Sequence, residues 1–337
     1  MIQLVAGVDG GGSKTRVMVA GADGDVVAEM TGAGSATAPD LTDESAEVIA
    51  ALVRQTIAAA GHEAARPRVL VAGVAGVGRP AVQRALVAAL EDREIADQII
   101  VVGDGEIALY DAFGNGPGVL LISGTGSIAH GRGPSGISAR CGGWGPAVGD
   151  EGSGRWIGRR ALAIVAAASD GREPATELTG AILTAAQLND PTELIPWALA
   201  ATGKEVAALA PVVLNAAANG DARANALVGI AVEELVLHVR TLATRLFGDD
   251  RASVPVALAG GLMQKGSLLR KRLEQRLRSA VPGAQVRQGD IVPCCGAVKW
   301  AAALARRTGS IATTTTTDFT TDAQMVADDT DEERNYR

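Results

Sequence analysis

The chain is poor in cysteine, histidine and aromatic side chains, and these shortages exclude whole classes of protein. Among 337 residues there are only three cysteines and three histidines. The cysteines Cys141, Cys294 and Cys295 are odd in number and show no Cys-x-x-Cys spacing, so neither a disulfide framework nor a zinc or iron–sulfur centre is indicated. The adjacent pair is interpreted either as reactive or as two buried structural thiols, and the second interpretation is favoured.

Long apolar runs and a strong charge of either sign are also missing. No apolar segment approaches the ~18 residues of a membrane-spanning helix, and no charged region precedes an apolar one at the N-terminus. We therefore expect a cytoplasmic protein with no membrane partner. The formal net charge is −7, but seven acids and two arginines after residue 307 account for most of it. The nearly neutral remainder predicts no nucleic-acid partner.

What the sequence has instead is glycine and small aliphatic side chains. Hydrophobic residues make up 47% of the chain, aromatic residues make up 3%, and 42 residues are glycine. Small side chains must therefore do most of the packing, which favours closely packed α/β layers over a disordered chain. The length indicates about two domains with a sizeable core.

The N-terminal part of the chain alternates between strand and helix patterns. Apolar runs predict strands, while apolar residues at helical spacing predict helices. An Asp-Gly turn at Ala22–Asp25 predicts a hairpin. The predicted order is three meandering strands, then helix, strand, helix and strand, at residues 2–9, 15–21, 26–30, 44–60, 67–73, 80–91 and 98–102. We expect a mixed sheet with helices on its faces.

Part of this plan recurs at Gly118–Ser138, which reads strand, turn, strand, turn and the start of a strand. Two related α/β halves imply a cleft with one small-residue turn on each side. Residues 161–247 are mostly helical, with a break where Asp190 can cap and Pro191 can open a helix. A strand at 254–261 and two further helices follow.

These patterns predict two domains and a tail. The first domain spans residues 1–117, and the second spans 118–307, with a helical insertion and a last helix able to return to the first domain. Residues 308–337 are rich in threonine and acid, with too few apolar residues to offset the entropy of ordering. Disorder of this tail is favoured over a role in partner binding.

The first glycine-rich turn lies in "VDGGGSKT", Val8–Thr15. It is not a Walker A loop, because Ser13 precedes Lys14 where that motif requires glycine and a hairpin follows instead of a helix. It also lacks the third glycine of a dinucleotide-binding fingerprint. What remains is a turn whose backbone N–H groups can line phosphate oxygens, beside a carboxylate, Asp9, able to hold Mg²⁺. An ordinary glycine-rich hairpin is the alternative.

A second turn of the same composition, "SGTGS", occupies Ser123–Ser127. Two such turns at equivalent places in two similar halves favour a nucleotide clamp. The segment "LAGG", Leu258–Gly261, ends a strand, and its bare backbone could lie against adenosine. By itself, a Gly-Gly pair at a strand end is usually only a tight turn.

Asp104 directly follows the apolar strand at 98–102, at the strand end where α/β sheets place ligands. A single carboxylate there suits a general base that takes a hydroxyl proton during phosphoryl transfer. A helix-capping role for Asp104 is the structural alternative. Glu106 and Asp111 are rivals, and both are expected at solvated helix positions.

The densest feature is "CGGWGPAVGDEGSGRWIG", Cys141–Gly158, with seven glycines, two tryptophans and an Asp-Glu pair. Tryptophan against the apolar face of a sugar ring, with a carboxylate bonding the hydroxyls, is a common arrangement in ligand sites. The alternative is a structural Ω-loop held by Trp144 and Trp156.

Taken in order, DGGGSKT, GDGEIAL, SGTGS, GGWGPxxGDEGSGxWIG, LAGG and PxxGA resemble the N-acetylglucosamine kinase branch of the BadF/BadG/BcrA/BcrD ATPase family. The resemblance covers about residues 5–305, and GGWG…GDEGS is its most specific part. It implies an α/β fold of two actin-like (ribonuclease H-like) domains around a nucleotide-binding cleft. It also implies ATP and Mg²⁺ as cofactors.

The resemblance assigns roles residue by residue. Asp104 matches the catalytic base, and Asp9 would serve Mg²⁺. The nucleotide would be bound by the three glycine-rich segments, at Gly10, Gly11, Gly12, Ser13, Lys14, Thr15, Gly124, Thr125, Gly126, Gly260 and Gly261. The sugar would contact Asp104, Gly143, Trp144, Gly145 and Asp150. The family usually has an asparagine in the turn after the third strand, and here Thr37 or Ala36 falls at that place.

The leading hypothesis is an ATP-dependent kinase that converts N-acetylglucosamine to N-acetylglucosamine 6-phosphate. Glucosamine and N-acetylmuramic acid are alternative substrates, because the expected asparagine is missing. A second hypothesis is an ATPase that activates a CoA-ester dehydratase or reductase, but the cysteine spacing disfavours its iron–sulfur cluster. A sugar-responsive regulator is the least favoured class. The resemblance also makes a homodimer possible.

Overall fold

The computed structural model describes residues 3–248 and 253–309, so the predicted tail at 308–337 lies almost entirely outside the described residues. The first half holds a five-stranded sheet of order β3-β2-β1-β4-β5. Its strands are β1 (Leu4–Gly10), β2 (Thr15–Gly21), β3 (Val26–Gly32), β4 (Val69–Val74) and β5 (Gln98–Val102). Three helices accompany them, α1 (Thr42–Ala59), α2 (Pro80–Glu91) and α3 (Asp104–Phe113).

The second half repeats this plan with a sheet of order β10-β9-β6-β7-β8. Its strands are β6 (Gly118–Ser123), β7 (Ser127–Arg132), β8 (Ser138–Gly142), β9 (Val254–Ala259) and β10 (Ala284–Val286). In both sheets the first two pairings along the chain are antiparallel and the later ones are parallel. The architecture is therefore α/β with two actin-like domains, as the sequence predicted.

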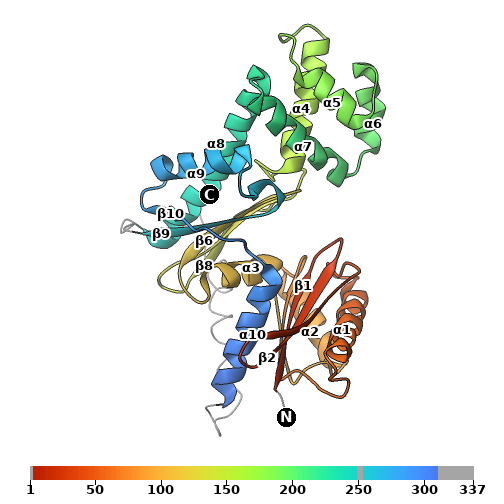
Figure 1. The fold of residues 1–337 in the computed structure, drawn as a ribbon, viewed down its shortest axis with the longest axis vertical. Coiled ribbons are helices and arrows are strands. Elements are labelled where there is room, and N and C mark those ends of the chain that lie inside the picture. Colours follow the sequence, from red (N-terminus) through yellow and green to blue (C-terminus); the bar gives the residue numbers. More distant parts are fainter. Residues whose placement is uncertain (1–2, 249–252, 310–337) are drawn as a thin grey trace, which may run out of the picture.

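Helices fill the connections of the second half. The long segment between β8 and β9 holds α4 (Gly154–Ser169), α5 (Leu178–Ala186), α6 (Leu194–Ala200), α7 (Gly203–Ala218) and α8 (Ala222–Phe247), with a short 3₁₀ turn at Pro191–Glu193. This helical region lies at the far end of the molecule from the first sheet (Figure 1). A second 3₁₀ turn (Gly261–Met263), α9 (Leu268–Ala280) and α10 (Pro293–Gly309) follow. As predicted, Asp190 caps the 3₁₀ turn by accepting from the Thr192 N–H at 2.8 Å.

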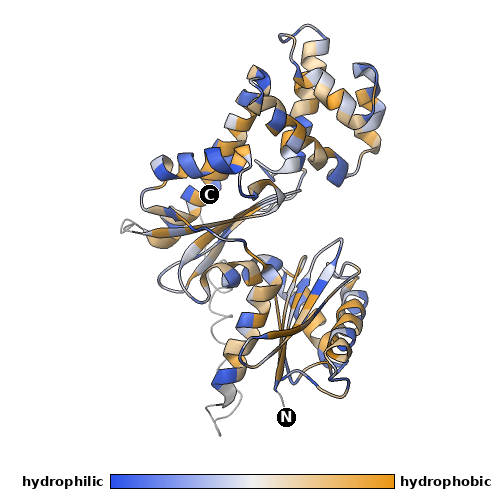
Figure 2. Cartoon of the chain, viewed as in Figure 1, coloured by the Kyte–Doolittle hydropathy of each residue, from blue (hydrophilic) through white to orange (hydrophobic). Residues whose placement is uncertain are grey.

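The apolar runs form strands because both faces of each sheet are covered. In β2, Val17 and Val19 face the core under α1, while Met18 and Ala20 face the core under α10. A strand buried on both faces needs apolar residues at every position, since successive side chains point to opposite faces. Figure 2 shows hydrophobic residues concentrated in the strands of both sheets.

The two halves are joined by an exchange of helices. The helix after β5, α3, packs Ala108, Leu109 and Ala112 against the second sheet. The equivalent helix after β10, α10, returns to the first sheet and packs Val298 and Ala301 against it. The two helices lie side by side at the junction of the halves (Figure 1). Each sheet is therefore covered by a helix from the other half of the chain.

The crossing of α3 and α10 is close and includes polar contacts. The Lys299 Nζ atom lies 2.6 Å from Asp111 Oδ1, and the Asp111 Oδ2 atom accepts from the Val292 N–H at 2.8 Å. The Tyr110 and Trp300 rings stack with centroids 5.0 Å apart. The expected solvated position of Asp111 is thus wrong, because its side chain is only 6% exposed and ties the two helices together.

The cysteine pair lies on α10. Cys294 is buried, and its thiol donates to the Gly7 carbonyl at 3.4 Å, while burial strongly raises its pKa. Cys295 is half-buried, and burial also raises the pKa of its thiol. Both thiols are therefore held in the neutral, unreactive form, which agrees with the structural interpretation. In the part of the chain that the structure describes, no helix has the length and apolarity that crossing a bilayer requires.

Substituting Gly296 with alanine should destabilise the protein. A Cβ atom at this position of α10 would overlap the Ile107 carbonyl oxygen and lie 2.8 Å from the Asp111 backbone nitrogen, and neither backbone atom can move without shifting α3. We expect a loss of about 1–3 kcal/mol in the free energy of unfolding, measured by urea denaturation.

The matched control is Gly229→Ala, on the exposed side of α8, where an added Cβ meets no atom within 4 Å. This variant should gain up to about 1 kcal/mol, because alanine is the better helix former. Equal stabilities of the two variants would contradict the close crossing of α3 and α10.

Candidate active site

A cavity of about 840 Å³ lies between the two halves and is lined by both of them. The first half contributes Thr37, the start of α2 and the start of α3. The second half contributes β7, β8 and Gly143. The cavity lies between the two halves, as the predicted cleft should, but neither glycine-rich turn is part of its lining.

Asp104 lines this cavity and is exposed to it. It is the first residue of α3, and its carboxylate accepts a local hydrogen bond from the Gly105 N–H at 3.0 Å. The capping contact belongs instead to Glu106, whose Oε1 atom accepts from the Gly103 N–H at 3.0 Å. The carboxylate of Asp104 therefore remains available to a ligand.

Glu106 lies in the same cavity wall and, as expected, at an exposed position of α3. The surrounding protein raises the pKa of its carboxyl by desolvation, which outweighs the lowering effects of the Gly103 N–H and Arg132. The residue is nonetheless exposed, and it lines the open cavity. Because it is already bonded to the helix start, Glu106 acts as a cap.

Asp9 ends β1 and is electrostatically coupled to Asp104. Burial raises the pKa of Asp9, the negative charge of Asp104 raises it further, and Lys14 and Arg16 lower it. Two neighbouring carboxylates suit a divalent cation, which typically uses one or two protein carboxylates together with phosphates and water. In the described ranges, no cluster of three or more His, Cys, Asp or Glu side chains forms a complete metal cage.

The first glycine-rich turn connects β1 to β2 and exposes Gly12, Ser13 and Lys14. It is closed by the Gly11 N–H, which donates to the Lys14 carbonyl at 3.0 Å. Thr15, expected at the nucleotide, is buried instead, and its hydroxyl donates to Ser35 Oγ at 2.7 Å. This side chain supports the turn, while Gly10, whose missing Cβ leaves room for Ser35, is buried beneath it.

The second turn, Gly124–Gly126, connects β6 to β7 and lies against the "LAGG" turn. Gly260 has φ +98°, and a Cβ there would overlap the Ser123 carbonyl, so only glycine fits. A Cβ at Gly124 would lie 3.6 Å from the Gly261 nitrogen. The structure thus brings together the two segments predicted for the phosphates and for adenosine. Thr125 is exposed at the tip.

The Gly142–Gly154 loop is attached directly to this second turn. The Ser123 Oγ atom donates to the Gly152 carbonyl at 3.0 Å, and the Ser127 Oγ atom donates to the Glu151 carbonyl at 2.7 Å. The Gly154 N–H donates to the Gly124 carbonyl at 2.7 Å. Asp150 is 9% exposed with φ +62°, and a Cβ at Gly126 would lie 3.1 Å from its carboxylate.

The other residues of this loop are spread over different surfaces. Gly143 lines the large cavity. Gly145 has φ +83°, and a Cβ there would meet no atom within 4 Å. Trp144 lies outside that cavity, is 68% exposed, and its ring sits 5.2 Å from the Arg140 guanidinium carbon. The stacking of this indole on a sugar therefore finds no support in the geometry, although its backbone neighbours Gly143.

Thr37 lies at the cavity beside the strand end of β4. Its N–H donates to the Ala75 carbonyl at 2.8 Å, and its side chain is 7% exposed. A Cβ at Gly76 would overlap the Thr37 carbonyl, so a glycine is needed where the two segments touch. The turn carrying Thr37 is consequently fixed in place at the cavity wall.

Sequence reasoning missed His130 and Arg140, which also line the cavity. The His130 ring occupies the space that a Cβ at Gly105 would need, next to Asp104. Burial lowers the pKa of His130, more than the Asp104 charge raises it, so the ring is neutral at pH 7. Their position in the β6–β7–β8 repeat, opposite the predicted base, is the signal that could have indicated them.

This architecture of two equivalent α/β halves, each with a glycine-rich turn after its first strand, is that of the actin-like ATPase fold. Residues 6–301 match the BadF/BadG/BcrA/BcrD ATPase family, and the chain belongs to that family.

Curated relatives are similar over most of their length. An N-acetylmuramic acid/N-acetylglucosamine kinase of Clostridium acetobutylicum is 31% identical over 287 residues, covering 85% of this chain and 94% of the relative. An N-acetyl-D-glucosamine kinase of Dictyostelium discoideum is 28% identical over 308 residues, covering 88% and 96%.

Solved structures agree on the fold. A protein of Chromobacterium violaceum, provisionally designated an N-acetylglucosamine kinase, superposes with a TM-score of 0.72 at 32% identity, covering 89% of this chain and 99% of that one. A ROK family glucokinase of Streptomyces griseus, solved with glucose and AMPPNP, has a TM-score of 0.53 at 18% identity, covering 90% and 99%. The second likeness shows the fold alone.

Substituting Asp9 with asparagine should stabilise the ligand-free protein at neutral pH. The pKa of Asp9 is raised above 3.8 in the folded state, so folding favours its protonated form and the charged form costs stability above the folded-state pKa. Removing the charge removes that cost. The gain should shrink as the pH falls through the folded-state pKa of Asp9 toward 3.8, where the wild-type carboxyl is itself protonated.

Urea denaturation at neutral and acidic pH measures this difference. The control is Asp40→Asn, at an exposed aspartate, which should change stability little at either pH. An Asp9→Asn protein that is less stable than the wild type at neutral pH would contradict the raised pKa.

Proposed function

We propose that the protein transfers the γ-phosphoryl group of ATP to the 6-hydroxyl of N-acetylglucosamine. The observation that carries the proposal is the position of Asp104, which is exposed in a cavity of about 840 Å³ that both domains line. Family membership and the kinases among the relatives support it.

Asp104 is proposed to accept the proton of the acceptor hydroxyl as the oxygen attacks phosphorus. Its position at the carboxyl end of β5 brings it to the cleft, and Glu106 leaves it free by capping the helix itself. Neutral His130 beside it adds no competing positive charge that would hold the carboxylate in an ion pair. An aspartate within hydrogen-bond reach of the acceptor hydroxyl can serve as such a base.

The nucleotide is proposed to lie between the first turn, Gly10–Thr15, and the second, Gly124–Gly126, with Gly260 and Gly261 against adenosine. Backbone N–H groups of such turns can bind phosphate oxygens without side chains. Asp9 would hold Mg²⁺, which neutralises charge on the phosphates during transfer. The raised pKa of Asp9 supports this assignment, because a bound cation would relieve the cost of its charge.

The sugar is proposed to contact Thr37 and Gly143 on the two sides of Asp104, and also Gly145 and Asp150 of the Gly142–Gly154 loop. Trp144 is included through its backbone rather than its indole, which is directed away. A location in the cytoplasm is part of the proposal and is supported by the free thiols of all three cysteines.

N-acetylmuramic acid is a second candidate substrate, supported by one specific observation. Arg140 and Arg132 line the cavity, and a cationic wall suits a sugar that carries a carboxylate. The relative from Clostridium acetobutylicum bears both sugars in its name. A comparison of kcat/KM for the two sugars, by coupled ADP release, decides which one the protein prefers.

Asp104→Asn should lower kcat for sugar phosphorylation by about 10²–10⁴-fold, the usual contribution of a general base. Nucleotide affinity should remain close to that of the wild type, because the amide preserves the shape of the side chain. ADP release and calorimetric titration with an ATP analogue measure the two quantities.

The matched control is Glu106→Gln in the same cavity wall. Since the Glu106 carboxylate is held by the Gly103 N–H at the start of α3, and glutamine keeps an oxygen that can accept this bond, we expect a much smaller loss of kcat. If Glu106→Gln abolished activity and Asp104→Asn kept it, the assignment of the base would be overturned.

A further inference from the structure

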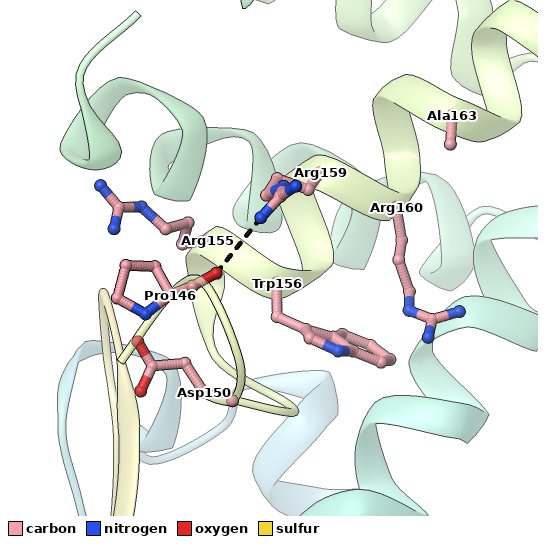
Figure 3. A pocket seen from close by; sticks show the side chains of 8 residues that line it. Pro146, Asp150, Arg155, Trp156, Arg159, Arg160 and Ala163 are labelled. Atoms are coloured by element: carbon pink, nitrogen blue, oxygen red, sulfur yellow. Dashed lines mark hydrogen bonds between the residues drawn. The ribbon is translucent and has the colours of Figure 1, made fainter. Parts of the chain in front are cut away.

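On the second half of the chain, the side chains that line the cavity of about 840 Å³ belong to β7 and β8. The Gly142–Gly154 loop contributes Gly143, which has no side chain. Asp150 of the same loop lines a smaller cavity, of about 320 Å³, at the start of α4 (Figure 3). A side chain of this half that bonds a ligand in the large cavity therefore comes from one of the two strands.

Strand β7 turns one of its faces to this cavity. Ile128, His130 and Arg132 line the cavity, whereas Ala129 is buried in the core that α8 covers. Successive side chains of a strand point to opposite faces of the sheet, so the three lining residues share one face. Because β7 is paired with β6 on one side and with β8 on the other, His130 is carried by an inner strand rather than by a loop.

The His130 ring is held against the start of α3, directly beside Asp104. A Cβ at Gly105 would overlap the Nε2, Cδ2 and Cε1 atoms of the ring, so a glycine is needed where the strand and the helix meet. Gly105 is buried and follows Asp104 in the chain. The imidazole and the proposed base are therefore neighbours, one from each half of the chain.

The imidazole is neutral, and in this form it carries both kinds of hydrogen-bonding group. Burial lowers the pKa of His130, and the positive charge of Arg140 lowers it further, while the negative charge of Asp104 raises it. A neutral imidazole has one N–H donor and one nitrogen acceptor, and a sugar hydroxyl has one O–H donor and an acceptor oxygen. The two groups match without an ion pair.

In the part of the chain that the structure describes, no protein group is hydrogen-bonded to the His130 ring. The charged neighbours are bonded elsewhere, since Asp104 accepts from the Gly105 N–H and Arg140 Nη1 donates to the Gly142 carbonyl at 3.0 Å. By contrast, the buried His238 has its Nδ1 atom 2.7 Å from the Glu234 carbonyl oxygen. The ring of His130 is thus available to a group that enters the cavity.

We propose that His130 is a specificity-determining residue that hydrogen-bonds the 4-hydroxyl of the sugar. The contact rests on the proposed function, in which Asp104 meets the 6-hydroxyl. On a hexopyranose the 4-hydroxyl is the ring hydroxyl nearest to the 6-hydroxyl, so a side chain next to the base meets it first. The contact selects sugars that carry this hydroxyl, and N-acetylglucosamine and N-acetylmuramic acid both do.

Steady-state kinetics of the full chain with N-acetylglucosamine and its 4-deoxy analogue test the contact. The wild type is compared with His130→Leu, which removes both ring nitrogens, and with His130→Gln, which keeps a donor and an acceptor. The control is His62→Leu, in the connection between α1 and β4 and outside the cavity. Circular dichroism and urea denaturation establish that each variant is folded.

The wild type should use the parent sugar with a kcat/KM about tenfold or more above that of the analogue, because a site that bonds a hydroxyl discriminates against its absence. In His130→Leu this ratio should fall by about that factor, through loss on the parent sugar, while KM for ATP is unchanged. Lost packing alone would lower kcat/KM for both sugars and leave the ratio as it was. His130→Gln should keep most of the ratio, and His62→Leu should keep all of it.

A folded His130→Leu protein with the wild-type ratio would overturn the proposal and leave the kinase activity standing. Calorimetric titration of the same two sugars measures binding without turnover. If the wild type binds the parent sugar more tightly than the analogue through His130 but transfers no phosphoryl group, the kinase fails and the contact is supported. If the wild type binds neither sugar, both are contradicted.

Discussion

The close crossing of α3 and α10 is the contact on which the arrangement of the two halves depends. Gly296 lets the backbones approach, and the Asp111–Lys299 pair and the Tyr110–Trp300 stack fix the position of one helix along the other. Helix α3 covers the second sheet and helix α10 covers the first sheet, so each sheet is buried by a helix from the other half of the chain. Because Asp104 begins α3, the same crossing determines where the proposed base meets the cleft.

The site concentrates unfavourable interactions that the rest of the fold must offset. Burial and the negative charge of Asp104 raise the pKa of Asp9. Asp150 adopts a left-handed backbone conformation, which is rare for residues other than glycine. Such strain persists where the surrounding structure over-determines it. Here the buried strands beneath the turns and the hydrogen bonds of Ser123 and Ser127 provide that support.

Much of the fold could be predicted because its signals are local. Helix α2 begins and ends where the sequence indicated, at Pro80 and Glu91, since proline opens it and apolar residues recur at helical spacing. Strand β10 was missed, because three residues paired only with β9 carry no pattern of their own. Asp111 was misjudged for the same reason, since its partners Lys299 and Val292 lie far along the chain.

The candidate site was only partly accessible to sequence reasoning. Motif residues such as Asp104 and Gly143 do line one cavity. The direction of a side chain, however, depends on tertiary contacts that a sequence motif does not specify. Thr15 turns inward to Ser35, Trp144 turns outward to Arg140, and His130 enters the cavity from the neighbouring strand.

The Gly142–Gly154 loop gives the two proposed substrates a common support. One end provides Gly143 to the large cavity, and the other is hydrogen-bonded to Ser123–Ser127 through Gly152, Glu151 and Gly154. A displacement of this loop by a sugar must therefore move, or be resisted by, the turn at Gly124. Binding of sugar and nucleotide is thus expected to be coupled within the second domain itself, before any motion of one domain relative to the other.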